Sequence, residues 1–144
     1  MKVFITGGSG FIGLYLVKHL LEQGHEIKVL DLRKPNIVHK NLEFVKKSIM
    51  DELAKDIHGC DIVYHFAALL GVDNSDNKPL ETMKINLEGS VNVFKATIKA
   101  GVKQILYSSS SEVYGEPREL PIREDSTKGP VSTYGVSKLA AEIY

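Results

Sequence analysis

The sequence predicts an α/β protein built around a doubly wound parallel sheet. Short apolar segments rich in β-branched residues alternate with longer segments whose apolar residues recur at helical spacing. A glycine cluster separates the first such pair, and the length of 144 residues fits one domain. Alternating strands and helices imply parallel strands joined by right-handed crossovers, and wholly apolar strands are expected where helices cover both faces.

The first elements follow from changes in apolar periodicity. Residues 2–6 (KVFIT) are apolar and β-branched, which predicts a strand. Residues 11–23 carry apolar side chains at helical spacing and are followed by Gly24, which predicts a helix that ends there. Residues 26–30 (EIKVL) and 42–45 (LEFV) are again short and apolar, and they predict the second and third strands.

The later elements repeat the pattern. Residues 61–65 (DIVYH) and 104–107 (QILY) predict the fourth and fifth strands. Between them, residues 79–100 are expected to form one long helix, because a proline lies at its start and a glycine follows its end. Residues 132–144 predict a last helix. A polar loop is expected at 73–78, beyond a strand end, where α/β proteins place ligands.

Composition excludes several classes of protein. Lys and Arg together number 18, as do Asp and Glu, and no basic stripe is present, so nucleic acid is not an expected partner. No secretory leader is expected, because MKVFITGG enters a strand-like run directly and then meets glycines, and no apolar run is long enough for a membrane span. Cys60 is the only cysteine, which favours a cytoplasmic location. The histidines lack metal-ligand spacing, so no metal is expected.

The stretch TGGSGFIG, between the first strand and the first helix, predicts a dinucleotide-binding loop. Glycines allow a tight turn and a close approach of backbone to a pyrophosphate, which the helix N-terminus then favours. Asp31 ends the second strand, where a carboxylate can bind the adenosine ribose hydroxyls and repel a 2′-phosphate, which favours NAD over NADP. Arg33 and Lys34 lie nearby and oppose that preference. A purely structural turn and a methyltransferase loop remain alternatives.

Tyr134 and Lys138 in YGVSK predict a catalytic pair on the last helix. A spacing of four residues places them on one face, one turn apart. We expect the ammonium to lower the pKa of the phenol, so that Tyr134 can act as a general base toward an alcohol. Lys138 can also bind the nicotinamide ribose, and a hydroxyl from the serine run after the fifth strand can steady the reacting oxygen.

Together these features resemble the N-terminal part of the extended short-chain dehydrogenase/reductase family, in its NAD-dependent nucleotide-sugar epimerase/dehydratase branch. The motifs that carry the resemblance are TGGSGFIG, the strand-end Asp31, HFAA, NLEGSVNVFKA, SSSSEVYG and YGVSK. The resemblance implies a Rossmann-type fold, NAD as cofactor and a nucleotide sugar as substrate.

The resemblance also assigns roles to individual residues. The implied cofactor-binding residues are Gly7, Gly10, Phe11, Ile12, Asp31, Ser48, Ile49, Phe66, Ala67, Ala68 and Lys138. The implied catalytic residues are Ser110, Glu112, Tyr134 and Lys138. Asn86 matches a helix asparagine near the family's active site, with a packing role equally expected.

Two departures from the family pattern bear on function. Many relatives have Asp-Ile where this chain has Ser48-Ile49, and that acid contacts adenine. In 4,6-dehydratases Asp and Glu follow the catalytic hydroxyl residue, whereas this chain has Ser111 and Glu112 at those positions. A Ser-Glu pair there resembles that of the nucleotide-sugar decarboxylases. An epimerase similar to UDP-glucose 4-epimerase is favoured. A decarboxylase, a dehydratase, a non-catalytic NAD-binding module and an NADP-dependent carbonyl reductase remain open.

The resemblance implies a protein about twice as long. We therefore expect residues 1–144 to form an incomplete dinucleotide-binding domain that lacks the last strands and the substrate domain, and that turns over no sugar by itself. The outer edge of the fifth strand would then be unpaired, which predicts a homodimer or other self-association.

Overall fold

The computed structural model describes residues 1–70 and 77–144, which divide into two units. The sheet unit comprises residues 1–68 and 92–108, and the helical unit comprises the described residues of 69–91 and 109–144. Most of the polar loop predicted at 73–78 lies outside the described residues.

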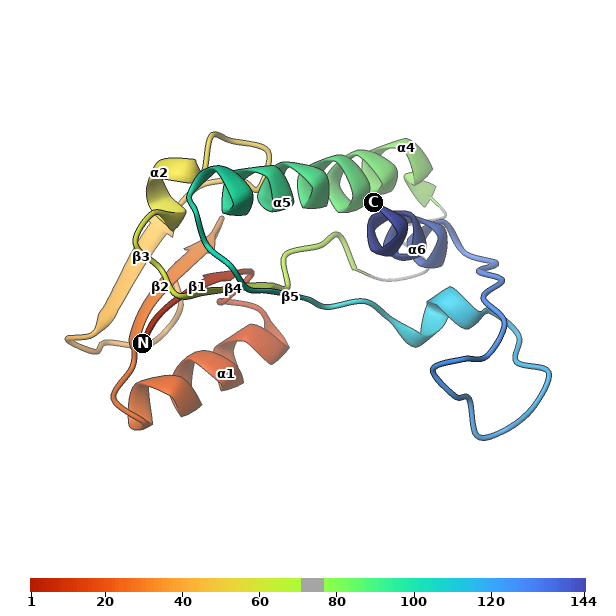
Figure 1. The fold of residues 1–144 in the computed structure, drawn as a ribbon, viewed down its shortest axis with the longest axis horizontal. Coiled ribbons are helices and arrows are strands. Elements are labelled where there is room, and N and C mark those ends of the chain that lie inside the picture. The colour runs from red at the N-terminus through yellow and green to blue at the C-terminus, as the bar shows by residue number, and fades with distance from the viewer. Residues whose placement is uncertain (71–76) are drawn as a thin grey trace. The chain divides into compact units, whose positions relative to one another are not determined.

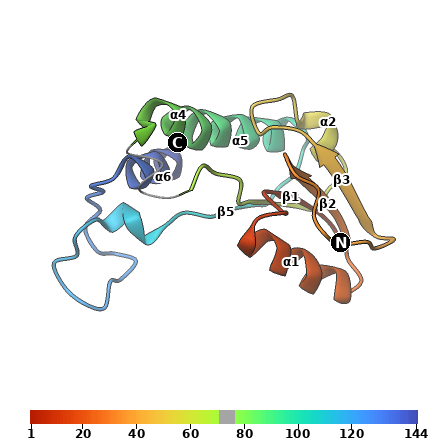
Figure 2. The same ribbon diagram turned by 180° about the vertical axis from the view of Figure 1, so that it is seen from behind.

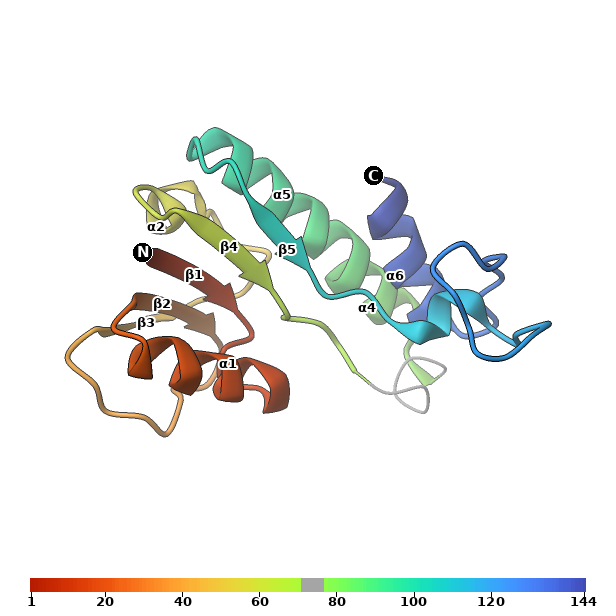
Figure 3. The same ribbon diagram turned by 60° about the horizontal axis from the view of Figure 1, so that its bottom comes forward.

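The sheet unit is built on five parallel strands, whose arrows point the same way in Figure 3. The strands are β1 (Lys2–Thr6), β2 (Glu26–Asp31), β3 (Leu42–Lys46), β4 (Ile62–His65) and β5 (Ile105–Tyr107). Their order in the sheet is β3-β2-β1-β4-β5, so that the chain first winds outward from β1 to one edge and then returns to build the other. The carboxyl ends of β1 and β2 thereby lie side by side, in the register that pairs Thr6 with Leu30.

Helices cover both faces of this sheet. Helix α1 (Phe11–Glu22) lies on one face, while α2 (Ala54–Ile57) and the part of α5 (Gly89–Lys99) that belongs to this unit lie on the other (Figures 1 and 2). The core beneath α1 contains strand residues and Val17 of the helix, all nearly inaccessible to solvent. The predicted doubly wound parallel sheet is therefore confirmed.

The helical unit gathers four short elements around the last helix. These are α4 (Pro79–Met83), the π-helical segment η1 (Lys84–Glu88), the first residues of α5, and the 3₁₀ segment η2 (Ser111–Tyr114). Helix α6 (Thr133–Ile143) packs against α4, η1 and η2. Ser132 caps α6, since its hydroxyl accepts a hydrogen bond from the Gly135 N–H at 3.0 Å.

The predicted elements are present, with small differences at their ends. The long helix expected at 79–100 is interrupted by the π turn of η1, which the apolar pattern does not reveal. The sequence prediction also missed α2 and η2, because each has only four residues and shows no periodicity. Among the described residues, no helix is long and apolar enough to cross a membrane.

Candidate functional site

The glycine loop after β1 is shaped by a close approach to the backbone that follows β4. Gly7 has a φ of 72°, and a Cβ there would lie 2.6 Å from the Ala67 nitrogen, so no other residue fits without displacement. Its N–H donates to the Leu30 carbonyl at 2.8 Å, and its carbonyl accepts from the Gly10 N–H at 3.0 Å. A Cβ on Gly13 would collide with that same carbonyl. The glycine spacing is thus required by the turn itself.

The helix that begins after this loop suits an anion. Its cap residue is Gly10, which offers no side-chain hydrogen bond, and the first turn contains no acidic residue. The first N–H groups of a helix lack intrahelical partners, and the helix dipole is positive there. Phe11 and Ile12 are 81% and 61% exposed, so their side chains do not pack over the start of the helix. These features fit the pyrophosphate of a dinucleotide.

A buried hydrogen-bond pair holds the carboxyl ends of β1 and β4 together. The Thr6 hydroxyl lies 2.6 Å from Nδ1 of His65, and both residues are almost fully buried. The same hydroxyl accepts from the Ala67 N–H at 3.3 Å. Phe66 and Ala68, the other predicted cofactor contacts on this segment, are half-buried. His65 therefore has a packing role, and it fixes the path of the segment that flanks the glycine loop.

Asp31 lies at the end of β2, beside the glycine loop. One carboxylate oxygen accepts from the Ser9 N–H at 3.0 Å, and the other accepts from the Arg33 N–H at 3.1 Å. A carboxylate has about four acceptor positions, so capacity remains for two ribose hydroxyls. This geometry fits the predicted role, and Ser9 is a contact that the sequence prediction missed.

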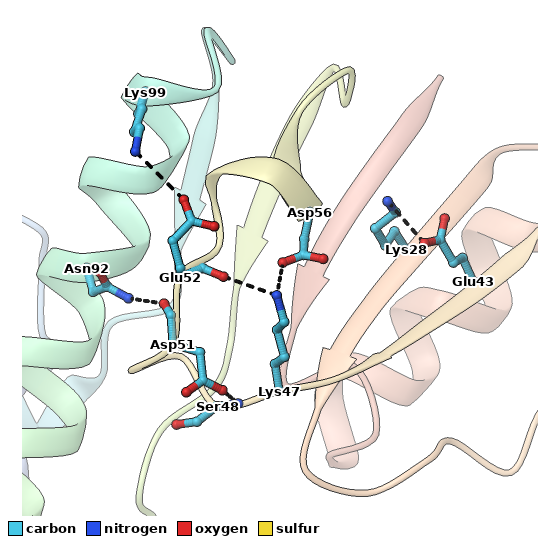
Figure 4. Close-up of polar contacts among 9 residues, drawn as sticks. All are labelled: Lys28, Glu43, Lys47, Ser48, Asp51, Glu52, Asp56, Asn92 and Lys99. Atoms are coloured by element: carbon cyan, nitrogen blue, oxygen red, sulfur yellow. Dashed lines mark hydrogen bonds and ion pairs between the residues drawn. The ribbon is translucent and has the colours of Figure 1, made fainter.

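The turn after β3 contains Ser48 and Ile49, and Figure 4 shows how it is held. The Ser48 N–H donates to the Asp51 carboxylate at 2.8 Å (Figure 4). The Ser48 hydroxyl accepts from the Met50 N–H at 3.1 Å. From α5, the Asn92 amide donates to the carbonyls of Ile49 at 2.7 Å and Asp51 at 2.8 Å. The serine that replaces the family's acid is therefore engaged in the turn, and Asn92 is a second residue that sequence reasoning missed.

Ion pairs reinforce the surroundings of that turn (Figure 4). Lys47 contacts the Asp56 carboxylate at 2.7 Å and the Glu52 carbonyl at 3.2 Å, and its hydrogen bond with Asp56 raises the pKa of the ammonium. Lys99 lies 3.7 Å from the Glu52 carboxylate. These contacts link β3, α2 and α5 around the predicted adenine position.

The helical unit contains all four predicted catalytic residues. Tyr134 is half-buried on α6, and Lys138 is only 3% exposed, with its nitrogen 5.7 Å from the centre of the Tyr134 ring. Burial disfavours the ammonium and lowers the pKa of Lys138 to about 8. The prediction that the pair shares one helix face is confirmed.

The expected pKa of Tyr134 is wrong for this structure. Burial, and then the nearby Glu112 carboxylate, raise the pKa of the phenol, while hydrogen bonding with Ser110 acts in the opposite direction. The Lys138 ammonium, 5.7 Å from the ring centre, does not offset these two effects. The raised pKa of Tyr134 and the lowered pKa of Lys138 thus both favour the neutral form of the side chain.

Ser110 and Glu112 are placed by the start of η2 and by the cap of α6. The Ser110 hydroxyl accepts from the Glu112 N–H at 3.2 Å, and the Glu112 carboxylate accepts from the Ser132 hydroxyl at 3.0 Å. Gly135 lies so close to the Glu112 carbonyl that a Cβ would approach it to 2.5 Å. Ser111 is exposed. Glu112 therefore helps to hold α6 against η2. Its negative charge also raises the pKa of Tyr134.

Asn86 in the π segment connects three parts of the helical unit. Its side chain accepts from the Leu69 N–H at 2.7 Å, and it donates to the Leu69 carbonyl at 3.0 Å and to the Ser137 hydroxyl at 3.1 Å. The Ser137 hydroxyl in turn donates to the Tyr134 carbonyl at 2.7 Å. Asn86 is 1% exposed, so its role is to position the helix that carries Tyr134 and Lys138. π-Helical turns often occur at such functional positions.

A parallel α/β sheet with a glycine loop at a helix N-terminus, an acidic strand end and a Ser-Tyr-Lys set defines a dinucleotide-dependent protein class of the Rossmann type. The model of the NAD-dependent epimerase/dehydratase family matches residues 3–144. The chain belongs to this family, and the family resemblance inferred from its motifs is confirmed.

Relatives and solved structures agree with this assignment. The chain is 36% identical to the UDP-glucose 4-epimerase of Yersinia enterocolitica over 160 residues, which cover 99% of the chain and 47% of the relative. It is similar to the structure of MoeE5 in complex with UDP-glucose and NAD (TM-score 0.92, 33% identity, 99% of this chain and 47% of that one). It is also similar to TunA, an NAD-dependent NDP-hexosamine 5,6-dehydratase (TM-score 0.89, 33% identity, 99% and 48%). The chain spans about half the length of these proteins.

Proposed function

We propose that the chain is the cofactor-binding part of an NAD-dependent nucleotide-sugar epimerase that acts through oxidation of a sugar hydroxyl. The observation that carries the proposal is the gathering of Ser110, Tyr134 and the buried Lys138 in one unit, with the phenol in hydrogen-bonding reach of Ser110. A family of epimerases and dehydratases, and a structural neighbour that binds UDP-glucose and NAD, support it.

In this proposal bound NAD would supply the acceptor for a hydride from the sugar carbon and, once reduced, the donor for its return. Tyr134 removes the proton of the sugar hydroxyl, and Ser110 donates a hydrogen bond to the same oxygen. The charged ammonium of Lys138 favours the phenolate form of Tyr134. Lys138 also binds the nicotinamide ribose. The N–H groups of Phe11 and Ile12 hold the pyrophosphate. Gly7 and Gly10, whose N–H groups bond to the Leu30 and Gly7 carbonyls, shape the turn that lets the pyrophosphate approach the backbone.

The adenosine end and the flanking segment complete the proposed cofactor site. Asp31 binds the ribose hydroxyls, which favours NAD. Ser48 and Ile49 face adenine, and the segment of Phe66, Ala67 and Ala68 lines the cofactor. The engaged hydroxyl of Ser48 makes its adenine contact weaker than that of an acid.

Glu112 supports a second candidate, a decarboxylase or dehydratase. It influences the pKa of Tyr134, as a charged group close to the reacting centre would. Its bond to Ser132 and the exposed Ser111 favour epimerisation, since a dehydratase needs an acid at Ser111 as well as a base.

The test uses the protein at its full natural length with NAD and UDP-glucose. Formation of UDP-galactose, followed by nuclear magnetic resonance, supports the proposal. Release of carbon dioxide from UDP-glucuronic acid, or a dehydrated product, selects the second candidate. Binding of NAD without turnover of any nucleotide sugar indicates a non-catalytic module, and absence of NAD binding overturns the proposal.

We also propose that the protein self-associates in the cytoplasm. β5 is the edge strand of the described sheet, and its Ile105 and Leu106 are 37% and 50% exposed. Residues 104 and 108 bond to β4, so the Ile105 N–H, one residue out of that alternation, faces the free edge. Sedimentation of the chain of residues 1–144 should show a dimer or larger species that Ile105→Pro weakens. A monomer at high concentration contradicts this.

A further inference from the structure

Ser9, in the middle of the glycine loop, contacts the acidic end of β2 twice. Its backbone N–H donates to the Asp31 carboxylate at 3.0 Å, and its hydroxyl donates to the Arg33 carbonyl at 2.6 Å. Because the Arg33 N–H donates to the other Asp31 oxygen at 3.1 Å, the three residues form a closed hydrogen-bonded ring. The glycine loop and the turn after β2 are therefore held together through Ser9.

The turn that Ser9 holds contains opposite charges. Asp31 is half-buried, whereas Arg33 and Lys34 are exposed, and within the described part of the chain neither basic side chain forms an ion pair. A pinned carboxylate accepts ribose hydroxyls and repels a 2′-phosphate, while a free guanidinium or ammonium attracts that phosphate. The balance depends on whether the carboxylate or the basic pair faces the ribose.

We propose that Ser9 is a positioning residue that sets the choice between NAD and NADP. Its hydroxyl holds the Arg33 carbonyl, which keeps the Asp31 carboxylate toward the ribose and the basic side chains of Arg33 and Lys34 turned away. Loss of that hydroxyl frees the turn, so that Arg33 can reach a 2′-phosphate. This inference rests on the proposed function, because it presupposes dinucleotide binding at the glycine loop.

The test compares the dissociation constants of NAD and NADP by calorimetry, on the full-length protein freed of bound nucleotide. Ser9→Ala removes the hydroxyl and keeps the N–H that binds Asp31. We expect the ratio of the NADP constant to the NAD constant to fall by up to about tenfold, the upper range for loss of one hydrogen bond in a part-exposed polar ring. Ser9→Thr, which keeps the hydroxyl, should retain the original ratio.

Two further variants separate this role from a structural one. Ser126→Ala removes a comparable serine bond to a backbone N–H, that of Arg123, and should leave the ratio unchanged. Arg33→Ala combined with Ser9→Ala should abolish the gain in NADP affinity, because the basic group that benefits is gone. If Ser9→Ala does not fold, as judged by thermal unfolding, Ser9→Cys replaces it in the same measurements.

An equal loss of affinity for both nucleotides in Ser9→Ala, or a shift in the ratio that persists without Arg33, overturns the inference alone. A wild-type protein that binds neither nucleotide overturns the proposed function and this inference together. The two failures are therefore distinguishable from the wild-type titration.

Discussion

The two units present their functional groups in opposite ways. In the sheet unit the glycine loop offers backbone N–H groups, and its geometry depends on side chains that are missing, as at Gly7 and Gly13. In the helical unit the functional groups are polar side chains, and Lys138 is a nearly buried ammonium whose pKa is lowered by desolvation. The glycine loop depends on the absence of side chains at closely packed positions, whereas the helical unit depends on charged and polar side chains.

Because of this difference, the residues that carry function contribute to the stability of the fold in one unit and oppose it in the other. The glycine turn is held by two backbone hydrogen bonds, from the Gly7 N–H to the Leu30 carbonyl and from the Gly10 N–H to the Gly7 carbonyl, while the first N–H groups of α1 stay available to an anion. A buried lysine opposes folding, because burial disfavours its charge. The catalytic region should therefore be the place where removal of a side chain abolishes activity yet leaves the fold as stable or more so.

Tyr134→Phe should have the largest effect, and it tests the claim that the helical unit supplies side-chain chemistry. Removal of the phenol oxygen takes away the general base, so kcat for sugar oxidation should fall about a thousandfold, equivalent to about 4 kcal/mol. Binding of NAD should change little. Steady-state kinetics with the full-length protein measures the first quantity and calorimetry the second.

The matched control is Tyr114→Phe, which removes the hydroxyl of a half-buried tyrosine on η2. Its kcat should remain close to that of the wild type. Equal losses in both variants would mean that the phenol of Tyr134 has no special role.

Lys138→Met tests whether the buried charge opposes folding. The pKa of Lys138 is about 8 in the folded chain and about 10.5 when unfolded, so between these pH values the unfolded state binds more protons. Stability should therefore rise with pH from 8 to 10.5, by up to about 3 kcal/mol, and the full penalty applies below pH 8. Lys138→Met should be the more stable protein near pH 7.

Urea unfolding at several pH values measures the free energy of both proteins. The difference between them should shrink as the pH approaches 10.5. A constant difference across this range would show that Lys138 stays charged in the folded state.

Sequence patterns predicted the sheet unit well, because strands and helices leave periodic signals. The five strands and α1 were located to within a residue or two of their ends, since apolar runs bounded by Gly24 or by polar residues are strong local signals. The π turn at η1 was not, because Asn86 makes its contacts with residues distant in sequence, and the 3₁₀ turn at η2 was not, because it is a single short turn capped locally by Ser110 and carries no repeat.

The candidate site divides in the same way. Glycines, Asp31 and the Tyr134–Lys138 spacing are visible in the sequence, because each depends on a short motif. Ser9 and Asn92 were missed, because their partners lie far along the chain, from 22 to 43 residues away, and no spacing rule connects them. The direction of the Tyr134 pKa was also missed, since burial is a property of the folded protein.

Gly7→Ala should destabilise the chain by about 3 kcal/mol and abolish binding of NAD. The substitution combines a positive φ with a Cβ that would meet the Ala67 backbone at 2.6 Å, so the loop must move. The control is Gly24→Ala, where φ is 81° but nothing lies within 4 Å of the added Cβ. That variant should lose only about 1 kcal/mol. Similar losses in the two variants, measured by urea unfolding, would contradict the claim that space specifies the loop.

Asn86→Ala and Asn92→Ala compare the two units directly. Each removes an asparagine that holds a backbone segment, but Asn86 is 1% exposed and leaves the N–H and carbonyl of Leu69 unpaired, whereas Asn92 is only half-buried. Asn86→Ala should cost about 2 kcal/mol of unfolding free energy and Asn92→Ala about 1 kcal/mol, because water can replace the lost bonds in the second case.

Asn86→Ala should also lower kcat, since α6 loses its anchor through Ser137, while Asn92→Ala should raise the dissociation constant of NAD with kcat unchanged. The reverse pattern of kinetic effects would place cofactor binding with Asn86 and chemistry with Asn92, and the division between the two units would not hold.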